Sequence, residues 1–501
     1  MSTIIFASVV LTTLVCVAIS YLFLNYRRRQ SFIKAVNTLP GPRLFPFIGN
    51  IYIFAQKNLD FLYVIDTMID IYPSPFRFWI GNKAFIEIYD ADQIKTVLQS
   101  RCFDKSLFYD TAKPLFGEGL ITSPTFTWIP HRKLAGPTFN THNLRGFFNK
   151  FVEHSLIFTD ELEKLNKNEI IFHKPILKTT VDIACETLMD VKLESETINE
   201  AFEVFTRKFS YRDNWNYILL GTLWNLNAVL NFTKIGKIIR RVSKVRNCIM
   251  NELEQSKSTL IKPDITENNK REKTLFTNFW EAYRGKSLTR KEFYDNIISI
   301  ILAASDTTAV VMYFVTFVLA NLPEIQEKAY KELLGIYGNK SPKSAPVKYE
   351  DLQHMDYLTR VIKETMRMFP AVPAIGRCLR EDLKIGEFTL PKGVDVIIPI
   401  VSVHRNKKYW PNPLMFDPDR FLPEKKVDSS NYYIPFSDGL RNCIGAKYAM
   451  MSMKVILATL IRTFEFKTDK KIKVDEIKLK MNITLEPVNP IKVKIEKRDL
   501  Q

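Results

Sequence analysis

The 501-residue sequence lacks the patterns that hold disulfide frameworks and structural zinc sites. Its six cysteines are far apart, and no two of them form a C-x-x-C pair. Its six histidines show no zinc spacing such as H-E-x-x-H. We therefore predict neither kind of site, and this cysteine usage indicates a reducing compartment.

Patterns for binding nucleotides or nucleic acids are also missing. There is no G-x-G-x-x-G fingerprint for a flavin or nicotinamide, no internal repeat and no low-complexity tract. The net charge is +17, but the basic residues are scattered rather than clustered with aromatic residues. We predict no nucleic-acid partner, and the charge favours an anionic membrane surface or an acidic protein instead.

No charged side chain occurs before Arg27, and residues 4–24 form an apolar run of 21 residues. A run of about 20 apolar residues can cross a bilayer as a helix. Three arginines, at 27–29, follow the run, which places the rest of the chain in the cytoplasm by the positive-inside rule. A cleaved signal peptide, the alternative, has a shorter apolar region with its positive charge in front. We predict a transmembrane signal anchor over residues 1–26, a basic and proline-rich hinge over 27–60, and a folded body over 61–501.

The body shows mostly amphipathic helical periods with a small β region. Residues 76–89 are apolar around a Gly81–Asn82 turn and predict a hairpin. A second strand region covers residues 383–400 and is broken at Pro391. Residues 262–287 are polar and rich in lysine and glutamate, which predicts a surface connection.

One long apolar segment predicts a buried helix. Thr289 and Glu292 form a capping box at its start, and Pro323 stops it after Leu322. Asp306 lies in the middle of this segment, where an ionisable side chain would be costly in lipid. A core helix with a polar catalytic patch is therefore favoured over a second membrane span.

The segment from Phe436 to Gly445 matches F-x-x-G-x-R-x-C-x-G, a pattern suited to an iron–porphyrin. A Cys443 thiolate would donate electron density to iron and favour O–O cleavage. Gly439 permits a tight loop whose N–H groups can face the sulfur, and Phe436 would shield the sulfur from water. Arg441 can pair with a haem propionate, and Gly445 lets the next helix approach the ring. A buried structural cysteine is the alternative.

This motif resembles the haem-binding loop of the cytochrome P-450 superfamily. The resemblance implies the mostly helical cytochrome P-450 fold, with 61–501 as its haem-thiolate catalytic domain. It also implies haem b (iron protoporphyrin IX) with Cys443 as axial ligand. Trp128-Ile-Pro-His-Arg132 is similar to the family's W-x-x-x-R, so Trp128 and Arg132 would bind one propionate. Arg377 falls where many relatives place another propionate-binding arginine.

Two further segments resemble family motifs. Ala303-Ala-Ser-Asp306-Thr307-Thr is similar to the distal-helix signature, which implies that Asp306 and Thr307 hold the water that delivers protons to oxygen. The family usually has glycine where Ala304 stands. Relatives that esterify the haem carry glutamate at the position of Ala303, so the haem is predicted to be non-covalently bound.

Glu364-Thr-Met-Arg367 resembles the family's E-x-x-R, and the segment from Phe416 to Phe421 resembles its third partner. Residues three apart share a helix face and can form an ion pair, although such pairs are usually solvated. The resemblance implies one buried charge network of Glu364, Arg367 and Arg420 beneath the haem.

The function implied is monooxygenation: one atom of O2 enters a lipophilic substrate such as a fatty acid, hormone, pheromone or xenobiotic. Residues 355–370 and 433–445 resemble insect members of the animal fatty-acid ω-hydroxylase branch. Substrate contacts are expected from residues 100–125 and 200–230. An electron-independent isomerase or dehydratase on the same fold, and a non-enzymatic haem-binding membrane protein, are the alternatives.

Electrons must come from another protein, since the chain has no flavin or nicotinamide fingerprint. The resemblance implies NADPH–cytochrome reductase, with cytochrome b5 as a second candidate, docking near Lys133, Lys447 and Lys454. It also implies a single-pass protein of the endoplasmic reticulum membrane, in contact with lipid, with its catalytic domain facing the cytoplasm.

Overall fold

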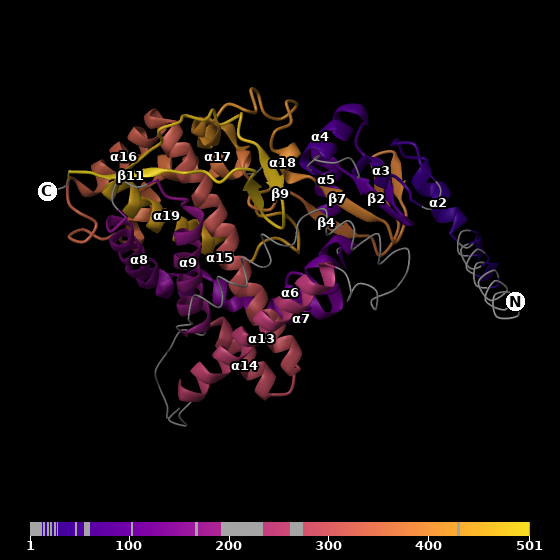
Figure 1. Ribbon diagram of the computed structural model, residues 1–501, viewed down its shortest axis with the longest axis horizontal. Helices are drawn as coiled ribbons and strands as arrows, with labels where there is room; N and C mark the ends of the chain where they lie inside the picture. Colours follow the sequence, from indigo (N-terminus) through magenta and orange to yellow (C-terminus); the bar gives the residue numbers. More distant parts are fainter. Residues whose placement is uncertain are drawn as a thin grey trace, which may run out of the picture.

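The computed structural model describes residues 29–45, 48–54, 61–101, 104–165, 169–191, 234–260, 274–427 and 431–499, with a few single residues before them. The predicted anchor over residues 1–26 lies almost wholly outside this part, and the expected substrate-contacting residues 200–230 lie entirely outside it. The described chain is mostly helical with a small β region (Figure 1). The predicted fold class is therefore confirmed for these residues.

The predicted hairpin is present at the edge of the main sheet. Strands β1 (Phe76–Ile80) and β2 (Lys83–Glu87) pair antiparallel around Gly81, whose positive φ of 57° suits the turn. The sheet has five strands in the order β1-β2-β7-β4-β3. Its other strands are β3 (Asp104–Lys105), β4 (Ile375–Cys378) and β7 (Asp395–Ile398). Segments about 300 residues apart in the sequence thus share one sheet.

The second strand region is broken twice rather than once. Gly386, at φ 58°, turns the chain between β5 (Leu383–Ile385) and β6 (Phe388–Leu390), which pair antiparallel. The predicted break at Pro391 then precedes β7. Two more small sheets near the C-terminus pair β8 (Phe464–Lys467) with β11 (Lys494–Lys497), and β9 (Leu479–Met481) with β10 (Leu485–Pro487).

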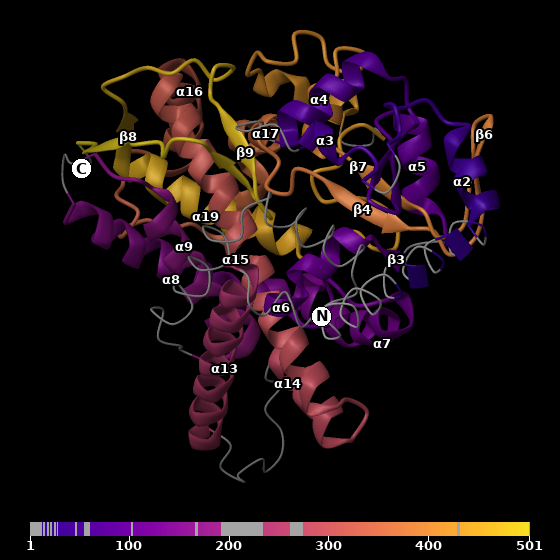
Figure 2. The same ribbon diagram turned by 45° about the vertical axis from the view of Figure 1, so that its right-hand side comes forward.

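Helix α15 (Arg290–Asn321) runs through the helical part of the molecule (Figure 2). The capping box between Thr289 and Glu292 is present, and Pro323 begins the next helix directly after Leu322. Among the described residues α15 is the helix long and apolar enough to cross a membrane, but it is mostly buried inside the protein. The prediction of a buried core helix is confirmed.

Other helices surround α15 and hold it in the core. Helix α9 packs along it, α8 packs on α19, and α17 lies against α15 and α16 (Figures 1 and 2). The bounds of these helices are α8 (Thr141–Glu163), α9 (His173–Ala184), α16 (Pro323–Tyr337), α17 (Asp356–Met368) and α19 (Ala446–Thr463). The described helices near the sheet are α2 (Gln30–Asn37), α3 (Ile51–Phe54), α4 (Phe61–Ile71), α5 (Ala91–Gln99) and α18 (Ile400–Val403).

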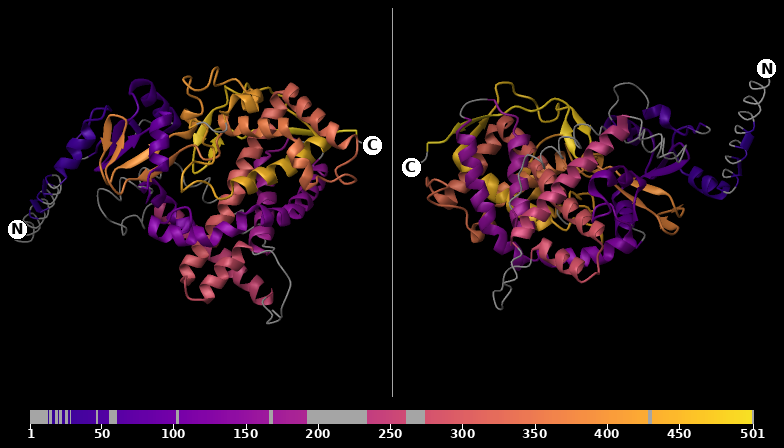
Figure 3. Two further views of the ribbon diagram at one scale, coloured as in Figure 1. Left: turned by 180° about the vertical axis from the view of Figure 1, so that it is seen from behind. Right: turned by 60° about the horizontal axis from the view of Figure 1, so that its bottom comes forward.

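Helices α13 and α14 project from one side of the molecule, and the other two remaining helices, α6 and α7, pack against them (Figure 3). The bounds of these helices are α6 (Lys113–Phe116), α7 (Thr125–Ala135), α13 (Lys234–Leu260) and α14 (Leu275–Arg284). Residues 262–273 of the predicted surface connection lie outside the described part of the chain, and the prediction was wrong for α14. Thr274 caps this helix, and Leu275, Phe276 and Phe279 bury one face of it. Those apolar residues recur at helical spacing within a stretch whose average composition is polar.

Candidate active site

A cavity of about 340 Å³ lies between the middle of α15 and the loop that precedes α19. Most of its lining side chains are apolar, and several come from residues 108–121. Cys443 lines this cavity, and so do Asp306 and Thr307. The structure therefore brings the two main predicted motifs to one enclosed space, although Asp306 and Cys443 are 137 positions apart in the sequence.

The loop that carries Cys443 is held tightly by its own backbone. The Cys443 N–H donates to the Phe436 carbonyl at 2.9 Å, which closes the loop. Gly439 has φ 71°, and a Cβ atom there would lie 1.9 Å from the backbone oxygen of Leu98. Both the left-handed backbone and the close approach to α5 require glycine at this position. The loop is thereby fixed against the sheet side of the molecule.

The Cys443 sulfur has accessible surface because it faces the cavity, although protein atoms surround it. Burial raises the pKa of this thiol, while the Gly445 N–H, which donates to the sulfur, and the nearby Arg132 guanidinium lower it. Phe436 is half-buried and lines the same cavity. These N–H and guanidinium groups are the kind of contacts that stabilise a metal-bound thiolate.

Gly445 differs from Gly439, because the protein itself leaves room for a side chain there. A Cβ atom at Gly445 would lie 3.9 Å from the Cys443 sulfur and 4.0 Å from Phe139, both ordinary contacts. Gly445 lines the cavity and precedes the first residue of α19. Its lack of a side chain therefore keeps space free beside the sulfur.

Four cationic side chains gather at one part of the cavity wall. Lys105, Arg132 and Arg441 line the cavity, and Arg377 is buried behind Ser437, to which its guanidinium donates at 3.3 Å. Burial lowers the pKa of Lys105 well below its usual range, and the charges of Arg377 and Arg441 lower it further. Burial also lowers the pKa of Arg441, to about 10. Desolvated cations this close together favour a bound anion.

Trp128 anchors two of these cations. The Arg441 guanidinium lies 4.3 Å from the centre of the Trp128 ring, and that of Arg132 lies 5.9 Å from it. Arg132 donates to the backbone oxygen and to the side-chain oxygen of Asn442, at 3.1 and 2.9 Å. Helix α7 is thus joined to the cysteine loop beside the sulfur.

Unpartnered donors indicate what this part of the cavity can bind. Arg441 donates to the Ser123 carbonyl at 3.0 Å, but its Nε and Nη1 atoms have no hydrogen-bond partner among the described residues. The Arg377 Nε atom is buried and likewise has no hydrogen-bond partner among the described residues. A ligand with carboxylates would satisfy these donors, and a haem carries two propionates. The donor set therefore fits a haem whose iron meets the sulfur.

Asp306 and Thr307 line the cavity from α15, but their side chains bond to different partners. The Thr307 hydroxyl donates to the Ala303 carbonyl at 2.8 Å, within the helix. Asp306 Oδ2 accepts from the Thr484 hydroxyl at 3.0 Å, and Thr484 lies between β9 and β10. The hydroxyl that meets the acid is therefore Thr484, far away in the sequence, while Thr307 faces the same space.

Asp306 is poised to gain and lose a proton near neutral pH. Burial raises the pKa of its carboxyl to about 7, the hydrogen bond from Thr484 lowers it, and the charge of Glu486 raises it. Its Oδ1 atom is buried and has no hydrogen-bond partner among the described residues. A carboxyl with a pKa near the working pH suits general acid catalysis.

The three residues expected beneath the haem lie together in the core. Arg367 donates to both Glu364 oxygens, at 2.7 and 2.8 Å, and neither side chain is exposed. The Arg420 Nε lies 3.4 Å from Glu364, and the Asp417 N–H donates to the same carboxylate at 2.9 Å. This pair is therefore buried and shared, unlike a solvated contact on a helix surface.

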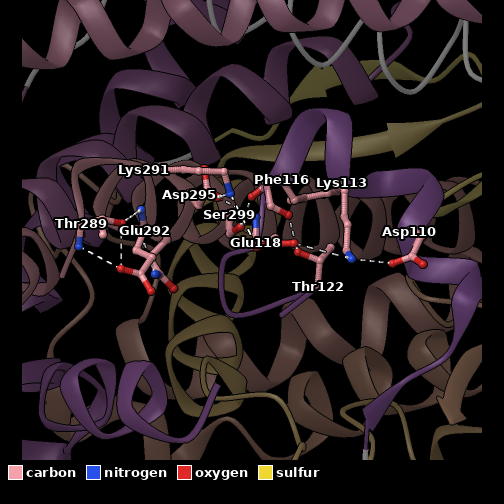
Figure 4. A network of polar contacts seen from close by, with 12 residues as sticks. Asp110, Lys113, Phe116, Glu118, Thr122, Thr289, Lys291, Glu292, Asp295 and Ser299 are labelled. Atoms are coloured by element: carbon pink, nitrogen blue, oxygen red, sulfur yellow. Dashed lines mark hydrogen bonds and ion pairs between the residues drawn. The ribbon is translucent and has the colours of Figure 1, made fainter. Parts of the chain in front are cut away.

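A second polar network fixes the wall of the cavity (Figure 4). The buried Asp295 on α15 accepts from the Glu118 N–H at 2.7 Å and from Lys291 at 2.9 Å, and it also pairs with Arg246 on α13. Ser299 donates to the Phe116 carbonyl at 2.9 Å. The wall segment around Phe116 is thus attached to the helix that carries Asp306.

Sequence reasoning missed three of these residues. Lys105 and Thr484 belong to no motif, and only the fold brings them to the cavity. Asp295 had a usable signal, since an acid eleven residues before Asp306 on an apolar helix must find a partner. Gly117 and Gly119 are the residues that make room for Asp295. A Cβ atom at either glycine would lie within 2.3 Å of an Asp295 or Ser299 atom.

Comparison with known proteins gives one consistent result. A sequence model of the family "Cytochrome P450" matches residues 39–495. The chain is 31% identical over 490 residues to cytochrome P450 4c21 of Blattella germanica. This alignment covers 95% of this chain and 96% of that protein. It is 30% identical to cytochrome P450 4g1 of Drosophila melanogaster, over 98% of this chain and 95% of that protein. It is also 30% identical to cytochrome P450 4V2 of Mus musculus, over 97% of this chain and 94% of that protein.

These matches span the described body, and the family's enzymes use a non-covalently bound haem with a cysteine thiolate as axial ligand. The cavity, its enclosed cysteine and the unpartnered N–H groups of Arg377 and Arg441 fit that cofactor. The chain therefore belongs to the cytochrome P450 family and is a haem-thiolate monooxygenase.

Proposed function

We propose that this enzyme inserts one oxygen atom into a lipophilic substrate bound against residues 108–121, with Cys443 as the axial ligand. One observation carries the proposal. One mostly apolar cavity is lined by Cys443, by cations that include Arg441 with its unpartnered donor atoms, and by Asp306 and Thr307. Apolar walls favour a lipophilic substrate such as a fatty acid, hormone, pheromone or xenobiotic.

Each group has one task in this proposal. Trp128, Arg132, Arg377 and Arg441, together with Lys105, hold the two propionates, and the Cys443 thiolate holds the iron. The bound haem supplies the oxygen-activating redox chemistry. Phe436 keeps water from the sulfur, and the apolar wall keeps it from the substrate. Asp306 carries the proton that is needed, and Thr307 orients the water that passes it on.

Two alternatives, an electron-independent isomerase or dehydratase and a non-enzymatic haem-binding protein, would give different results in one pair of assays. A reduced-minus-oxidised spectrum with CO tests the thiolate, and NADPH consumption with reductase tests electron use. We expect both to be positive, followed by oxygenated product from a panel of lipids, hormones and xenobiotics. Product formed without NADPH would support an isomerase or dehydratase. A spectrum without turnover of any panel member would support a haem-binding protein.

Replacing Thr307 should uncouple the reaction. In Thr307→Ala the hydroxyl that faces the cavity is lost, so NADPH is still consumed but peroxide replaces product, with coupled turnover lower by roughly tenfold or more. Product and peroxide per NADPH give the measurement. Thr316→Ala is the matched control, because its hydroxyl also donates to a carbonyl of α15, that of Tyr313 at 2.8 Å, but Thr316 does not line the cavity. Tight coupling in Thr307→Ala would mean that protons arrive by another route.

We propose that NADPH–cytochrome reductase, or cytochrome b5 for the second electron, docks beside the cysteine loop. Lys133 on α7 and Lys447 on α19 are both exposed. Lys454 was also predicted to lie at the docking face, but its ammonium donates to the Leu352 carbonyl at 2.8 Å, and burial lowers its pKa. Lys454 is therefore a structural residue and leaves Lys133 and Lys447 as the docking candidates.

Charge reversal at these two positions should weaken reductase docking. For Lys133→Glu with Lys447→Glu we expect the reductase KM to rise about tenfold at low salt, with a smaller difference at high salt. Turnover measured against reductase concentration at several salt concentrations decides this. Reversal of Lys473 serves as the control, because this exposed lysine follows Ile472, whose N–H donates to Asn321 at the C-terminal end of α15. An unchanged KM and salt dependence would place the docking face elsewhere.

We propose a single-pass protein of the endoplasmic reticulum membrane, with residues 1–26 as the anchor, 27–60 as the hinge and 61–501 as the cytoplasmic catalytic domain. The apolar run over residues 4–24 and the three arginines after it support this topology. Protease protection of the N-terminus in microsomes, with the catalytic domain digested from outside, is the expected result.

A further inference from the structure

His173 lies behind Asp306, on the side away from the cavity. It is the first residue of α9, the helix that packs along α15. Its Nε2 atom is 4.0 Å from Asp306 Oδ1, and a quarter of its side chain (25%) is exposed, against 9% for Asp306. Asp306 lines the cavity. The acid therefore stands between a partly solvent-exposed imidazole and the cavity.

The two oxygens of Asp306 are occupied differently. Oδ2 accepts from Thr484, whereas the buried Oδ1, which points toward His173, has no hydrogen-bond partner among the described residues. A distance of 4.0 Å exceeds a hydrogen bond by about 1 Å, which a small rotation of the His173 side chain can close. Oδ1 is therefore the atom at which a proton can arrive from the surface.

We propose that His173 is the positioning residue that supplies protons from solvent to Asp306 during turnover. This inference rests on the proposed role of Asp306. The protonated imidazole gives its Nε2 proton to Asp306 Oδ1, which leaves a neutral imidazole and a neutral carboxyl. Asp306 then releases a proton into the cavity and returns to the carboxylate, and His173 takes a new proton from a hydronium ion or buffer acid in the solvent. The proton count balances, and no electrons move in this exchange.

The groups around the pair suit this role. Asp306 has a pKa raised by burial to about 7, and histidine is the side chain whose usual pKa is nearest to that value. Glu486 on β10 faces Asp306, and Lys480 on β9 pairs with Glu486 at 3.2 Å. The ring of Tyr313 contacts His173, but burial raises the pKa of Tyr313 to about 12, so its hydroxyl stays protonated. His173 is thus the imidazole that lies beside the unpartnered oxygen of this raised-pKa carboxyl.

Variants of the full-length holoenzyme with reductase test the supply step. We expect His173→Gln to lower product formed per NADPH about tenfold, to increase peroxide and to enlarge the solvent isotope effect. His173→Lys should fail in the same way, because an ammonium keeps its proton at neutral pH. His142→Gln, at an exposed histidine on α8, is the control and should match the wild type. The double variant His173→Gln with Asp306→Asn should be no worse than Asp306→Asn alone.

A readout without turnover tests the contact itself. The chain has six histidines, so ¹³C labelling at the imidazole carbons gives few resonances, and the one lost in His173→Gln is assigned. A carboxylate nearby favours imidazolium. Removing it in Asp306→Asn should therefore lower the titration midpoint of His173, by about one pH unit.

The outcomes separate the two proposals. Normal coupling in Asp306→Asn would overturn the role of Asp306 and this inference with it. Uncoupling in Asp306→Asn with normal coupling in both His173 variants would overturn this inference alone. Recovery of coupling in His173→Lys would show that His173 acts only through its charge. An unshifted His173 midpoint in Asp306→Asn would show that the two side chains do not interact.

Discussion

In Cys443→Ser the CO-bound reduced enzyme should lose the absorption band at the wavelength that names the family, and turnover should fall to background. A serine hydroxyl is not ionised at neutral pH, so it cannot replace the thiolate that donates electron density to iron. Protein that retains haem through the cations around Trp128 would then show a spectrum without the thiolate band. The CO difference spectrum and haem content per chain give the measurement.

Two other cysteines provide matched controls for this prediction. Cys248→Ser changes an exposed side chain on α13, and Cys185→Ser changes a buried one near Tyr448, which lines the cavity. Burial raises the pKa of the Cys185 thiol far above its usual value, so it stays a thiol. Both controls should keep the thiolate band. An unchanged band in Cys443→Ser would remove Cys443 as the ligand.

Glu364→Ala should be the most destabilising of the substitutions considered. It leaves the fully buried Arg367 guanidinium, with Arg420 beside it, without its carboxylate. Breaking a buried pair by removing one partner costs about 3–5 kcal/mol, a large part of the 5–15 kcal/mol that keeps a typical protein folded. We expect a lower urea midpoint and a small fraction of haem-loaded protein after expression.

A surface Arg–Glu pair with a single hydrogen bond shows how much of this effect comes from burial. Arg145 and Glu350 are 2.7 Å apart, but both are more than 60% exposed. Glu350→Ala should therefore cost about 1 kcal/mol or less. Equal losses in Glu350→Ala and Glu364→Ala would contradict the special importance of the buried pair. Glu364→Gln, which can still accept from the Asp417 N–H, should fall between the two.

Local patterns were enough to predict the elements whose signals lie within a few residues. The capping box at Thr289, the stop at Pro323 and the turn at Gly81 all act over one or two turns of chain. The sequence around Cys443 was equally informative, because the loop contains the glycine it needs to close. Helix α14 was missed because four buried apolar residues were averaged with polar neighbours.

The rest of the site depends on contacts between distant segments. Nothing near Asp306 indicates that its hydrogen bond comes from Thr484, 178 residues later. Lys105 resembles any other lysine until the sheet places it beside Arg377 and Arg441. The role of Gly439 was explained only in part, since its close contact is with Leu98, a residue of a separate helix.

The way the cysteine loop is clamped has a consequence for how the enzyme is made. Gly439 rests on Leu98, and Arg441 donates to Ser123, 318 residues earlier, while the hydrogen bond to Asp306 comes from Thr484. A chain emerging from the ribosome N-terminus first has the walls of the cavity long before it has the loop that closes it. Haem capture therefore belongs to the last stage of biosynthesis. Until then the nascent chain exposes a large apolar surface, which makes that interval its most aggregation-prone.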